Sequence, residues 1–412
     1  TSPIMTTPTL EVTAASHVVA GVDTHSDTHH VAVLDSAGRR LGDHEFPATP
    51  AGYEQLHAYV KAFGSIALIG IEGTSSYGAG LTRYLSIRDV PIREIIRPKR
   101  APRRAGKSDP IDAYAAARQA LSEPETLPHA KNSDGHTEQI RVLLATRRSA
   151  IKARVAAARQ IKSLLVTAPD SIRTRWRAVS DKALIAGLAA TRPSGAITSV
   201  GAATAITLRR LARRCAYLDQ EITDVDEELR VLVATAAPAM IATKGYGVVT
   251  TATLLITAGA NPQRMHSEGS FAALCGASPI PASSGKTTRY RLNRGGDRQA
   301  NWALHQIALV RLSSDPRTKA YAARLRGTGK TKKDILRCLK RAIAREAFRL
   351  LTKPHLVPRT DDLRQLRHER GATLLDVALS LGAEPARISE LERGRRPNAE
   401  LATAYRAWLD VA

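Results

Sequence analysis

The N-terminal part of the chain alternates short apolar runs with amphipathic stretches. The runs "HVVAGVDT" (17–24) and "SIALIGIEG" (65–73) have the continuous apolar character of buried strands. Between them, "HHVAVLDSAGRRLGDHEFPA" predicts a hairpin that turns at residues 36–38. The pattern as a whole predicts a three-strand meander followed by α/β units, with a helix in 49–63, a second helix in 78–89 and a further strand in 90–98.

Helical periodicity dominates the middle of the chain. Residues 136–168 predict a long basic helix, and residues 202–234 predict a second one. The second carries apolar residues alternately three and four positions apart, which is a heptad seam: Leu208, Leu211, Cys215, Leu218, Ile222, Val225, Leu229 and Leu232. The seam is compatible with an intramolecular helical hairpin and with a dimerising coiled coil, and the sequence does not separate the two.

The remaining pattern divides the C-terminal half into two parts. A block rich in Gly, Ser and Arg at its centre ends before "KPHLVPRT", a linker with two prolines. We therefore predict four domains: an α/β domain at 17–125, a helical coiled-coil region at 136–235, a mainly α domain at 237–355 and a small all-α tail at 358–412.

Composition and charge limit the kinds of partner that the chain is expected to bind. The chain has 412 residues, 43% of them hydrophobic, with a net charge of +23 and a pI of about 10.4, which favours a polyanion such as nucleic acid. No apolar run approaches the ~20 residues that span a bilayer, so no membrane partner is predicted. The N-terminus lacks the pattern of a signal peptide. Three cysteines far apart suggest neither a zinc site nor disulfides, and a reducing cytoplasm is the expected compartment.

Two apolar runs each deliver one carboxylate at their end. Asp23 ends the first run and Glu72 ends "IALIGIE". Strands that end in acids can place them side by side at one sheet edge, where they repel unless a cation or proton lies between them. Oxygen ligands select Mg²⁺ or Mn²⁺, so a divalent metal site is predicted.

A second acidic pair lies in "KSDPIDAYAAARQAL". Asp109 before a proline reads as the N-cap of a helix, and Asp112 follows on the same side of the helix start. Simple capping explains the pair alone, and a metal cluster explains it beside Asp23 and Glu72.

Three histidines follow Asp23. Alternation places His29 and His30 on opposite faces, so we interpret them as surface or substrate-contact residues, with His25 near the site.

These motifs together resemble one family. The order "GVDTH…VAVLD", "IGIEGTSSYG", "KSDPIDA" resembles the N-terminal domain of the DEDD transposases of the insertion sequence 110 family, which includes the Piv-type DNA invertases. The resemblance implies a RuvC-like, ribonuclease H-type fold. It also implies that Asp23, Glu72, Asp109 and Asp112 are the family's four catalytic, metal-binding acids, in a two-metal site that clamps a phosphodiester.

The third block carries further family motifs. "IATKGYGVVTTATLLITAG" resembles the family's glycine element, which is similar to a helix-hairpin-helix. "SFAALCGASPIPASSGKTTRYRLNRGGDRQANWAL" resembles the family's transposase signature, in which Ser284 matches the nucleophilic serine and the adjacent Ser283 is the alternative. The resemblance covers residues 17 to about 355. Five cations near this serine are predicted to contact phosphates: Lys286, Arg289, Arg291, Arg294 and Arg298.

The tail departs from the family's usual plan. "LRQLRHERGATLLDVALSLGAEPARISELERGRRP" resembles a Cro/repressor-type helix-turn-helix. Ala378 and Gly382 are small where two helices approach, and Ile388 and Leu391 are expected in the core. Residues of the recognition helix would face the major groove: Ala386, Arg387, Ser389 and Glu390. A small protein-interaction domain is the alternative.

The resemblance implies a site-specific DNA recombinase of a mobile element that works through a metal-assisted phosphoserine intermediate. It implies donor and target DNA, a structured noncoding guide RNA and a homo-oligomer, from dimer to tetramer, as partners in the bacterial nucleoid. The alternatives are a RuvC-like hydrolytic nuclease, a sugar kinase or actin-like ATPase, and a non-enzymatic repressor. We find no second phosphate loop for a kinase, and a repressor leaves the four acids without a purpose.

Overall fold

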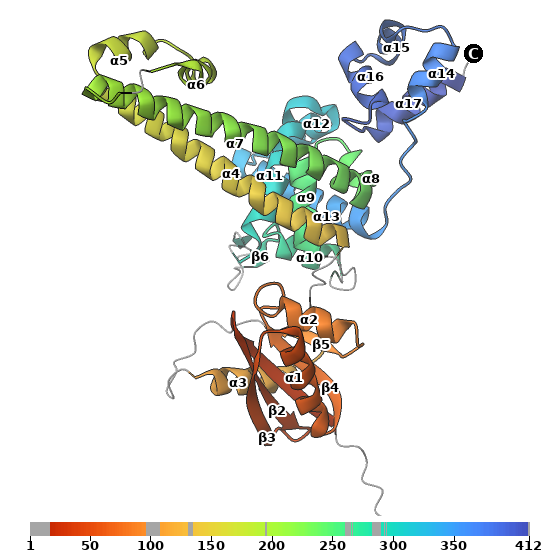
Figure 1. Cartoon of the computed structure of the whole chain (residues 1–412). Coiled ribbons are helices and arrows are strands. Elements are labelled where there is room, and N and C mark those ends of the chain that lie inside the picture. The colour runs from red at the N-terminus through yellow and green to blue at the C-terminus, as the bar shows by residue number, and fades with distance from the viewer. Residues whose placement is uncertain are drawn as a thin grey trace, which may run out of the picture. The chain divides into compact units, whose positions relative to one another are not determined.

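The computed structural model describes residues 17–95, 108–130, 135–193, 196–259, 265, 267–281, 290–291, 293 and 295–410. The chain forms two compact units, one of residues 1–134 with 259–265 and the other of residues 135–258 with 266–412. Figure 1 labels most of the elements of both. Within the described part, no helix combines the length and apolar character that crossing a membrane requires.

A mixed five-stranded sheet forms the centre of the first unit. Its order is β3-β2-β1-β4-β5; β1 pairs antiparallel with β2 and parallel with β4, and β4 pairs parallel with β5. The meander followed by α/β units is therefore confirmed, and the order is compatible with a ribonuclease H-like domain. The strands are β1 (His17–Thr24), β2 (Thr28–Asp35), β3 (Arg40–Pro47), β4 (Ser65–Glu72) and β5 (Ile92–Ile95).

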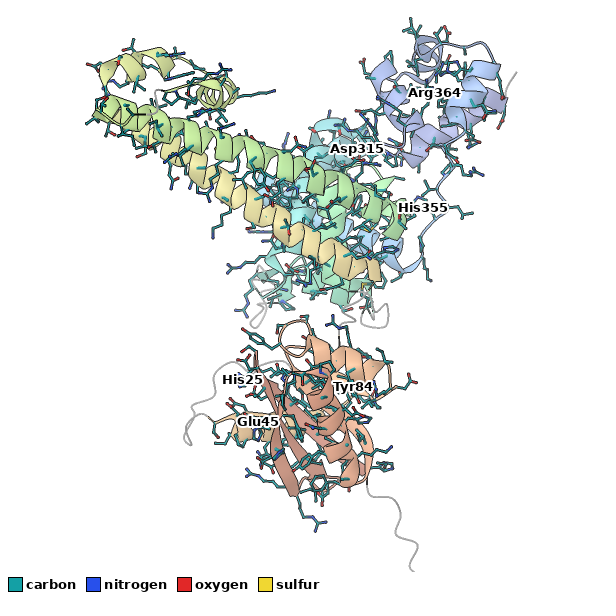
Figure 2. All side chains as sticks on the ribbon, in the orientation of Figure 1. His25, Glu45, Tyr84, Asp315, His355 and Arg364 are labelled. Carbon is teal, nitrogen blue, oxygen red and sulfur yellow. The ribbon has the colours of Figure 1, made fainter. Side chains whose placement is uncertain are left out.

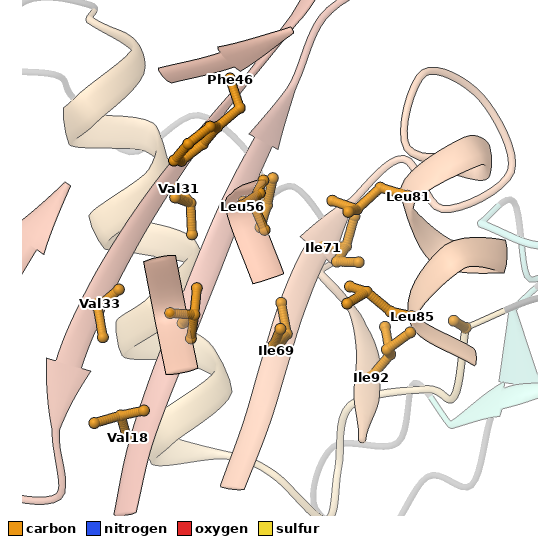
Figure 3. Close-up of a cluster of buried hydrophobic side chains, with 14 residues drawn as sticks. Val18, Val31, Val33, Phe46, Leu56, Ile69, Ile71, Leu81, Leu85 and Ile92 are labelled. Carbon is orange, nitrogen blue, oxygen red and sulfur yellow. The ribbon is translucent and has the colours of Figure 1, made fainter. Parts of the chain in front are cut away.

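The main core lies between one face of this sheet and two helices, α1 (Pro50–Ala62) and α2 (Ala79–Ser86). Alternate residues of each strand point to this face, as the pleat requires. In Figure 3, Leu56 of α1 and Leu81 of α2 point toward Ile69 and Ile71 of β4. Because the helix spacing and the strand alternation agree, this face could be predicted from the apolar pattern.

The opposite face of the sheet carries a single alanine-rich helix, α3 (Asp109–Ser122). Two glycines of the sheet allow its backbone to approach closely. A Cβ on Gly21 of β1 would lie 2.0 Å from the Ala117 nitrogen and 2.4 Å from the Ala113 oxygen. A Cβ on Gly70 of β4 would lie 2.9 Å from the Ala120 Cβ. Helix α3 is therefore seated directly on the backbones of β1 and β4.

We expect Gly21→Ala to destabilise the first unit by about 3 kcal/mol, because the added methyl group meets helix backbone that cannot rotate away. Thermal unfolding and hydrogen exchange of α3 in the full chain measure this. Gly201→Ala is the matched control, since a Cβ there comes no closer than 3.8 Å to any neighbour. Equal stability of Gly21→Ala and wild type would show that α3 is not held at this contact.

The second unit begins with a long antiparallel hairpin of α4 (Gly135–Val166) and α7 (Val200–Ala236), which run side by side in Figure 1. Arg147 pairs with Asp226 at 2.5 Å and Arg154 pairs with Asp219 at 3.0 Å across it. The seam is thus covered within the chain, which confirms the intramolecular interpretation. The seam residues that it buries are Leu208, Cys215, Leu218, Val225 and Leu229, and α5 (Asp170–Trp176) and α6 (Asp181–Ala190) lie between the two helices in sequence.

The block that follows is mainly helical. Asp297 caps α11, with its side chain accepting from the backbone N–H groups of Gln299 and Ala300, and Thr257 donates to its other oxygen at 2.9 Å. Helix α11 therefore begins at Arg298, directly after its cap. The elements are α8 (Pro238–Ile241), α9 (Val248–Ala258), α10 (Glu268–Leu274), β6 (Ile280–Pro281), β7 (Tyr290–Arg291), α11 (Arg298–Ser314), α12 (Pro316–Gly327) and α13 (Lys332–Thr352).

The tail forms α14 (Leu363–Glu369), α15 (Leu374–Leu381), α16 (Pro385–Glu392) and α17 (Ala399–Asp410), with α15 and α16 where two helices were predicted. Ile388 and Leu391 are buried, as expected. The reason given for Gly382 was wrong: a Cβ there would meet nothing within 4 Å, and glycine instead suits the φ of +59° that ends α15.

A buried ion pair ties the ends of the tail together. Arg367 donates to both carboxylate oxygens of Glu392, at 2.8 and 3.1 Å, and the Tyr405 hydroxyl donates to the same group at 2.8 Å. Burial raises the pKa of Glu392, but these hydrogen bonds outweigh burial and hold the pKa below its ordinary value. The pair is satisfied on both sides, so it can persist in an apolar core.

Candidate active site

The first two predicted acids lie at the carboxyl ends of neighbouring parallel strands. Val22 pairs with Ile71 in the register of β1 and β4, so Asp23 and Glu72 each come one residue later on the face that carries α3. Asp23 is only 2% exposed. The Thr24 hydroxyl donates to the Glu72 carbonyl at 2.8 Å and fixes the two strand ends to each other.

Helix α3 supplies the other two acids from its first turn. The cap position is occupied by Ser108, which has extended backbone angles, and the helix starts at Asp109 itself. The prediction that Asp109 is the N-cap was therefore wrong by one residue. The Ser108 side chain makes no capping hydrogen bond, and the Asp109 carboxylate lies 3.4 Å from the His25 ring. Both acids gain from the positive end of the helix dipole.

His25, labelled in Figure 2, follows the end of β1 and lies close to acids of both β1 and α3. Its Nε2 is 3.3 Å from the Asp23 Oδ2 and 3.4 Å from the Asp109 Oδ1. Ligand atoms of Asp23, His25 and Asp109 all lie within 4.8 Å of one another. Sequence reasoning placed His25 nearby but did not assign it a role. The alternating pattern gave no signal for a role, because His25 follows the end of β1 in a turn.

The charges of all four acids meet at Asp23. Burial is the largest influence and raises the pKa of the Asp23 carboxyl. The charge of His25 opposes this rise, while the charges of Glu72, Asp112 and Asp109 add to it. A buried carboxylate surrounded by like charges is poorly stabilised by protein alone. The oxygen and imidazole donors present here fit a divalent cation such as Mg²⁺ or Mn²⁺.

The other two histidines lie outside this cluster. His29 is fully buried and its ring stacks on Tyr53 with centroids 5.7 Å apart, so its interpretation as a surface or substrate-contact residue was wrong. Burial lowers the pKa of His29, because an apolar core disfavours the imidazolium. His30 points to the other face and pairs with Asp43 at 2.8 Å, as the strand alternation predicts.

The predicted serine site falls largely outside the described residues. Ser283, Ser284, Lys286, Arg289 and Arg294 all lie there. On either side of this stretch in sequence, β6 and β7 pair, with Pro281 opposite Tyr290 and Ile280 opposite Arg291. Arg291 and Arg298, the two predicted phosphate-contact residues that are described, are exposed.

The segment that resembles the family's glycine element contains Gly245 and Gly247, which precede α9. Gly245 has a φ of +92°, a left-handed angle that suits glycine. A cavity of about 910 Å³ beside it is lined by residues of both signs from α4 and α7, including Arg147, Arg230, Asp224 and Glu227. In the tail, Arg387 pairs with Glu390 at 3.2 Å, and Ser389 is partly exposed on the same helix.

Comparison with known proteins places the chain. Residues 20–168 match the family model of the IS110 DEDD transposases, and residues 237–323 match the model described as "Transposase IS116/IS110/IS902 family". The uncharacterized 42 kDa protein of insertion element IS900 from Mycobacterium paratuberculosis is 26% identical, over 77% of this chain and 91% of that protein. The uncharacterized 43.6 kDa protein of insertion element IS110 from Streptomyces coelicolor is 24% identical, over 81% and 94%. The chain belongs to the IS110 family of transposases.

Family membership decides among the broad alternatives. A transposase acts on DNA and is an enzyme, so neither the sugar kinase nor the non-enzymatic repressor describes this chain. The DEDD class indicates that a divalent metal ion is used, which agrees with the acid and histidine cluster at Asp23.

We expect Asp23→Asn to raise the unfolding temperature of the metal-free protein by roughly 3 °C at neutral pH, because it removes a buried charge that its neighbours repel. The same change should abolish the further stabilisation that Mg²⁺ or Mn²⁺ gives the wild type. Differential scanning calorimetry with and without the metal measures both effects. Asp27→Asn is the control, since Asp27 is exposed on the same turn. A metal-induced shift that survives in Asp23→Asn contradicts the site.

Proposed function

We propose that this transposase is a site-specific DNA recombinase that cuts and rejoins DNA through a phosphoserine intermediate. The observation that carries the proposal is the charge-coupled cluster around the buried Asp23, at the ends of two parallel strands of a sheet with ribonuclease H-like order. The second family match supports it, because residues 237–323 include the predicted serine at 284. The RuvC-like class of the first domain belongs to the same proposal.

The first unit prepares the phosphate. Asp23, Glu72, Asp109 and Asp112 are the proposed catalytic and metal-binding acids, and His25 supplies a nitrogen donor beside them. A bound divalent ion would polarise the scissile phosphate and stabilise the leaving oxygen. Gly21 contacts α3 at Ala113 and Ala117, directly after the turn that carries Asp109 and Asp112, and this contact holds the start of the helix close to β1.

The serine loop supplies the nucleophile. The Ser284 oxygen forms a bond to phosphorus as the bond from phosphorus to one deoxyribose oxygen breaks. Serine loses its proton, and the departing oxygen gains one as a hydroxyl. Attack by the hydroxyl of another strand then reverses this exchange and releases Ser284, so the bond energy is conserved without ATP. Lys286, Arg289, Arg291, Arg294 and Arg298 are the proposed phosphate contacts.

Further partners follow from the charge and from the chemistry. A net charge of +23 suits a structured noncoding guide RNA as well as donor and target DNA. Strand exchange requires several cleavages, which favours a dimer that pairs into a tetramer. Because α4 covers much of the seam of α7, the proposed assembly uses another surface. The expected location is the bacterial cytoplasm, at the nucleoid.

A RuvC-like hydrolytic nuclease is the second candidate. It is favoured by one observation: among the described residues, Asp23, His25 and Asp109 of the first unit come together as a group that could hold a metal ion. In that case water would attack the phosphate and Ser284 would serve the structure alone.

We expect Ser284→Ala to lose both the covalent protein–DNA adduct and strand exchange while binding of metal and DNA is kept, because the attacking oxygen is absent. Denaturing gel electrophoresis of protein incubated with labelled element-end DNA and Mg²⁺ measures the adduct. Ser283→Ala is the control and should form the adduct normally. The reverse pattern would move the role to Ser283, and strand cleavage by the wild type without any adduct would favour the hydrolytic nuclease.

The tail is the proposed sequence reader. Helix α16 carries Arg387 and Ser389 on a scaffold held by the Arg367–Glu392 pair. We expect Arg387→Gln to weaken binding of element-end duplex about tenfold by removing a charged contact, and to leave cleavage at saturating DNA unchanged. Lys353→Gln removes the same charge outside the tail and is the control. Loss of cleavage in Arg387→Gln at saturating DNA would contradict a purely binding role.

A further inference from the structure

A strongly cationic pocket lies in the second unit, against the side of α13. Its volume is about 460 Å³, and residues 276–279, β7 and α12 complete its walls. Of the fifteen described residues that line it, six are basic and one, Asp334, is acidic. The basic residues are Arg291, Lys330, Arg337, Lys340, Arg341 and Arg345.

The charge of this pocket follows from the way α13 is buried. The apolar face of the helix, with Ile335, Leu339 and Ile343, packs into the unit. The opposite side therefore carries a row of arginines at 337, 341 and 345, whose like charges four residues apart repel one another.

Only the two ends of this row have acidic partners among the described residues. Arg337 pairs with Asp334 at 2.8 Å, and Arg345 pairs with Glu268 at 2.6 Å. The central Arg341 makes no ion pair within the described part of the chain, and its guanidinium donates to the Ser278 hydroxyl. The middle of the row therefore carries positive charge that no ion pair of the described residues neutralises.

Lys340 adds a second such charge, half-buried at the wall of the pocket. Its ammonium donates to the Asn301 side-chain oxygen at 2.7 Å. The Asn301 amide in turn donates to the carbonyls of Cys275 and Gly276, at 2.9 and 3.0 Å, so the position of Lys340 is fixed. Burial, followed by the charge of Arg337, lowers the pKa of Lys340. An anion beside Lys340 and Arg341 would favour the charged form of Lys340, and would so oppose the lowering of its pKa by burial and by Arg337.

Two aromatic side chains line the same pocket. Tyr290 of β7 is 65% exposed, and Tyr321 of α12 lies on the wall. Fixed cations combined with exposed aromatic rings are how proteins hold single-stranded nucleic acid, since phosphates bind the cations and bases stack on the rings.

We propose that this pocket binds a single DNA strand, with a phosphodiester on Arg341 and Lys340 and a base stacked on Tyr290. The choice of DNA rests on the proposed recombinase function. Tyr290 and Arg291 lie six and seven residues after the predicted serine at 284, so the strand held here is a displaced or cleaved strand near the reaction. The pocket is separate in sequence and composition from the acid cluster.

Binding of a short oligothymidylate of about eight nucleotides to the full chain tests the proposal by fluorescence anisotropy. Arg341→Gln should weaken binding about tenfold and reduce the salt dependence by about one phosphate contact. Tyr290→Ala should weaken binding without changing the salt dependence. Lys333→Gln is the matched control, because Lys333 is exposed on the same helix outside the pocket, and it should bind as the wild type does.

The wild-type protein offers a second measurement. Cys338 lines the pocket, whereas Cys215 and Cys275 are buried. Bound oligothymidylate should therefore slow alkylation of Cys338, read by mass spectrometry of its peptide. An unchanged rate at saturating oligothymidylate overturns the proposal, as does wild-type affinity of Arg341→Gln. Protection by oligouridylate at lower concentration than by oligothymidylate also overturns it, by assigning the pocket to RNA.

Neither measurement requires catalysis, so the two proposals fail separately. Protection of Cys338 in the Ser284→Ala protein supports the pocket even where no serine adduct forms in the wild type. A normal adduct in the wild type without protection of Cys338 overturns the pocket and leaves the recombinase function standing.

Discussion

The close contact between α3 and the backbones of β1 and β4 is the constraint on which the first unit and its acid cluster depend. Gly21 and Gly70 each stand two residues before an acid, Asp23 and Glu72, on the same face of their strands. With side chains at these positions the helix could not approach, and its two acids would lie farther from the strand ends. Because they lack side chains, the two glycines determine how near the four carboxylates come to one another.

That proximity has an electrostatic cost that the local fold only partly offsets. The positive end of α3 and the imidazole of His25 favour negative charge, while burial of Asp23 and three neighbouring acids oppose it. Asp23 is therefore buried among other acids, even though the chain as a whole is strongly basic. A site of this kind is complete only with a cation, which links its stability to its chemistry.

The apolar pattern alone predicted the sheet and the long helices, because burial sets the backbone course, whereas the two helices of the tail motif were predicted from a resemblance to a known helix-turn-helix. Sequence reasoning gave wrong predictions where the local structure depends on a single residue or on a single neighbouring segment. Ser108 rather than Asp109 takes the cap position, and Gly382 serves a left-handed angle rather than a close contact. His29 is buried, although its type suggested the surface. The seam of α7 was ambiguous because the same stripe can be covered by either a second copy or α4. The cations of α13 were missed because their pocket requires segments far apart in sequence.

The α4–α7 hairpin also bears on how such chains can diverge. Its packing repeats every seven residues, and its two cross pairs, Arg147–Asp226 and Arg154–Asp219, are themselves one heptad apart on both helices. Gain or loss of a heptad from both helices together would preserve the repeat and leave the rest of the unit in register. The length of the α4–α7 hairpin can therefore change during evolution in steps of about 10 Å. Such changes leave the residues that are proposed to carry the chemistry unaltered.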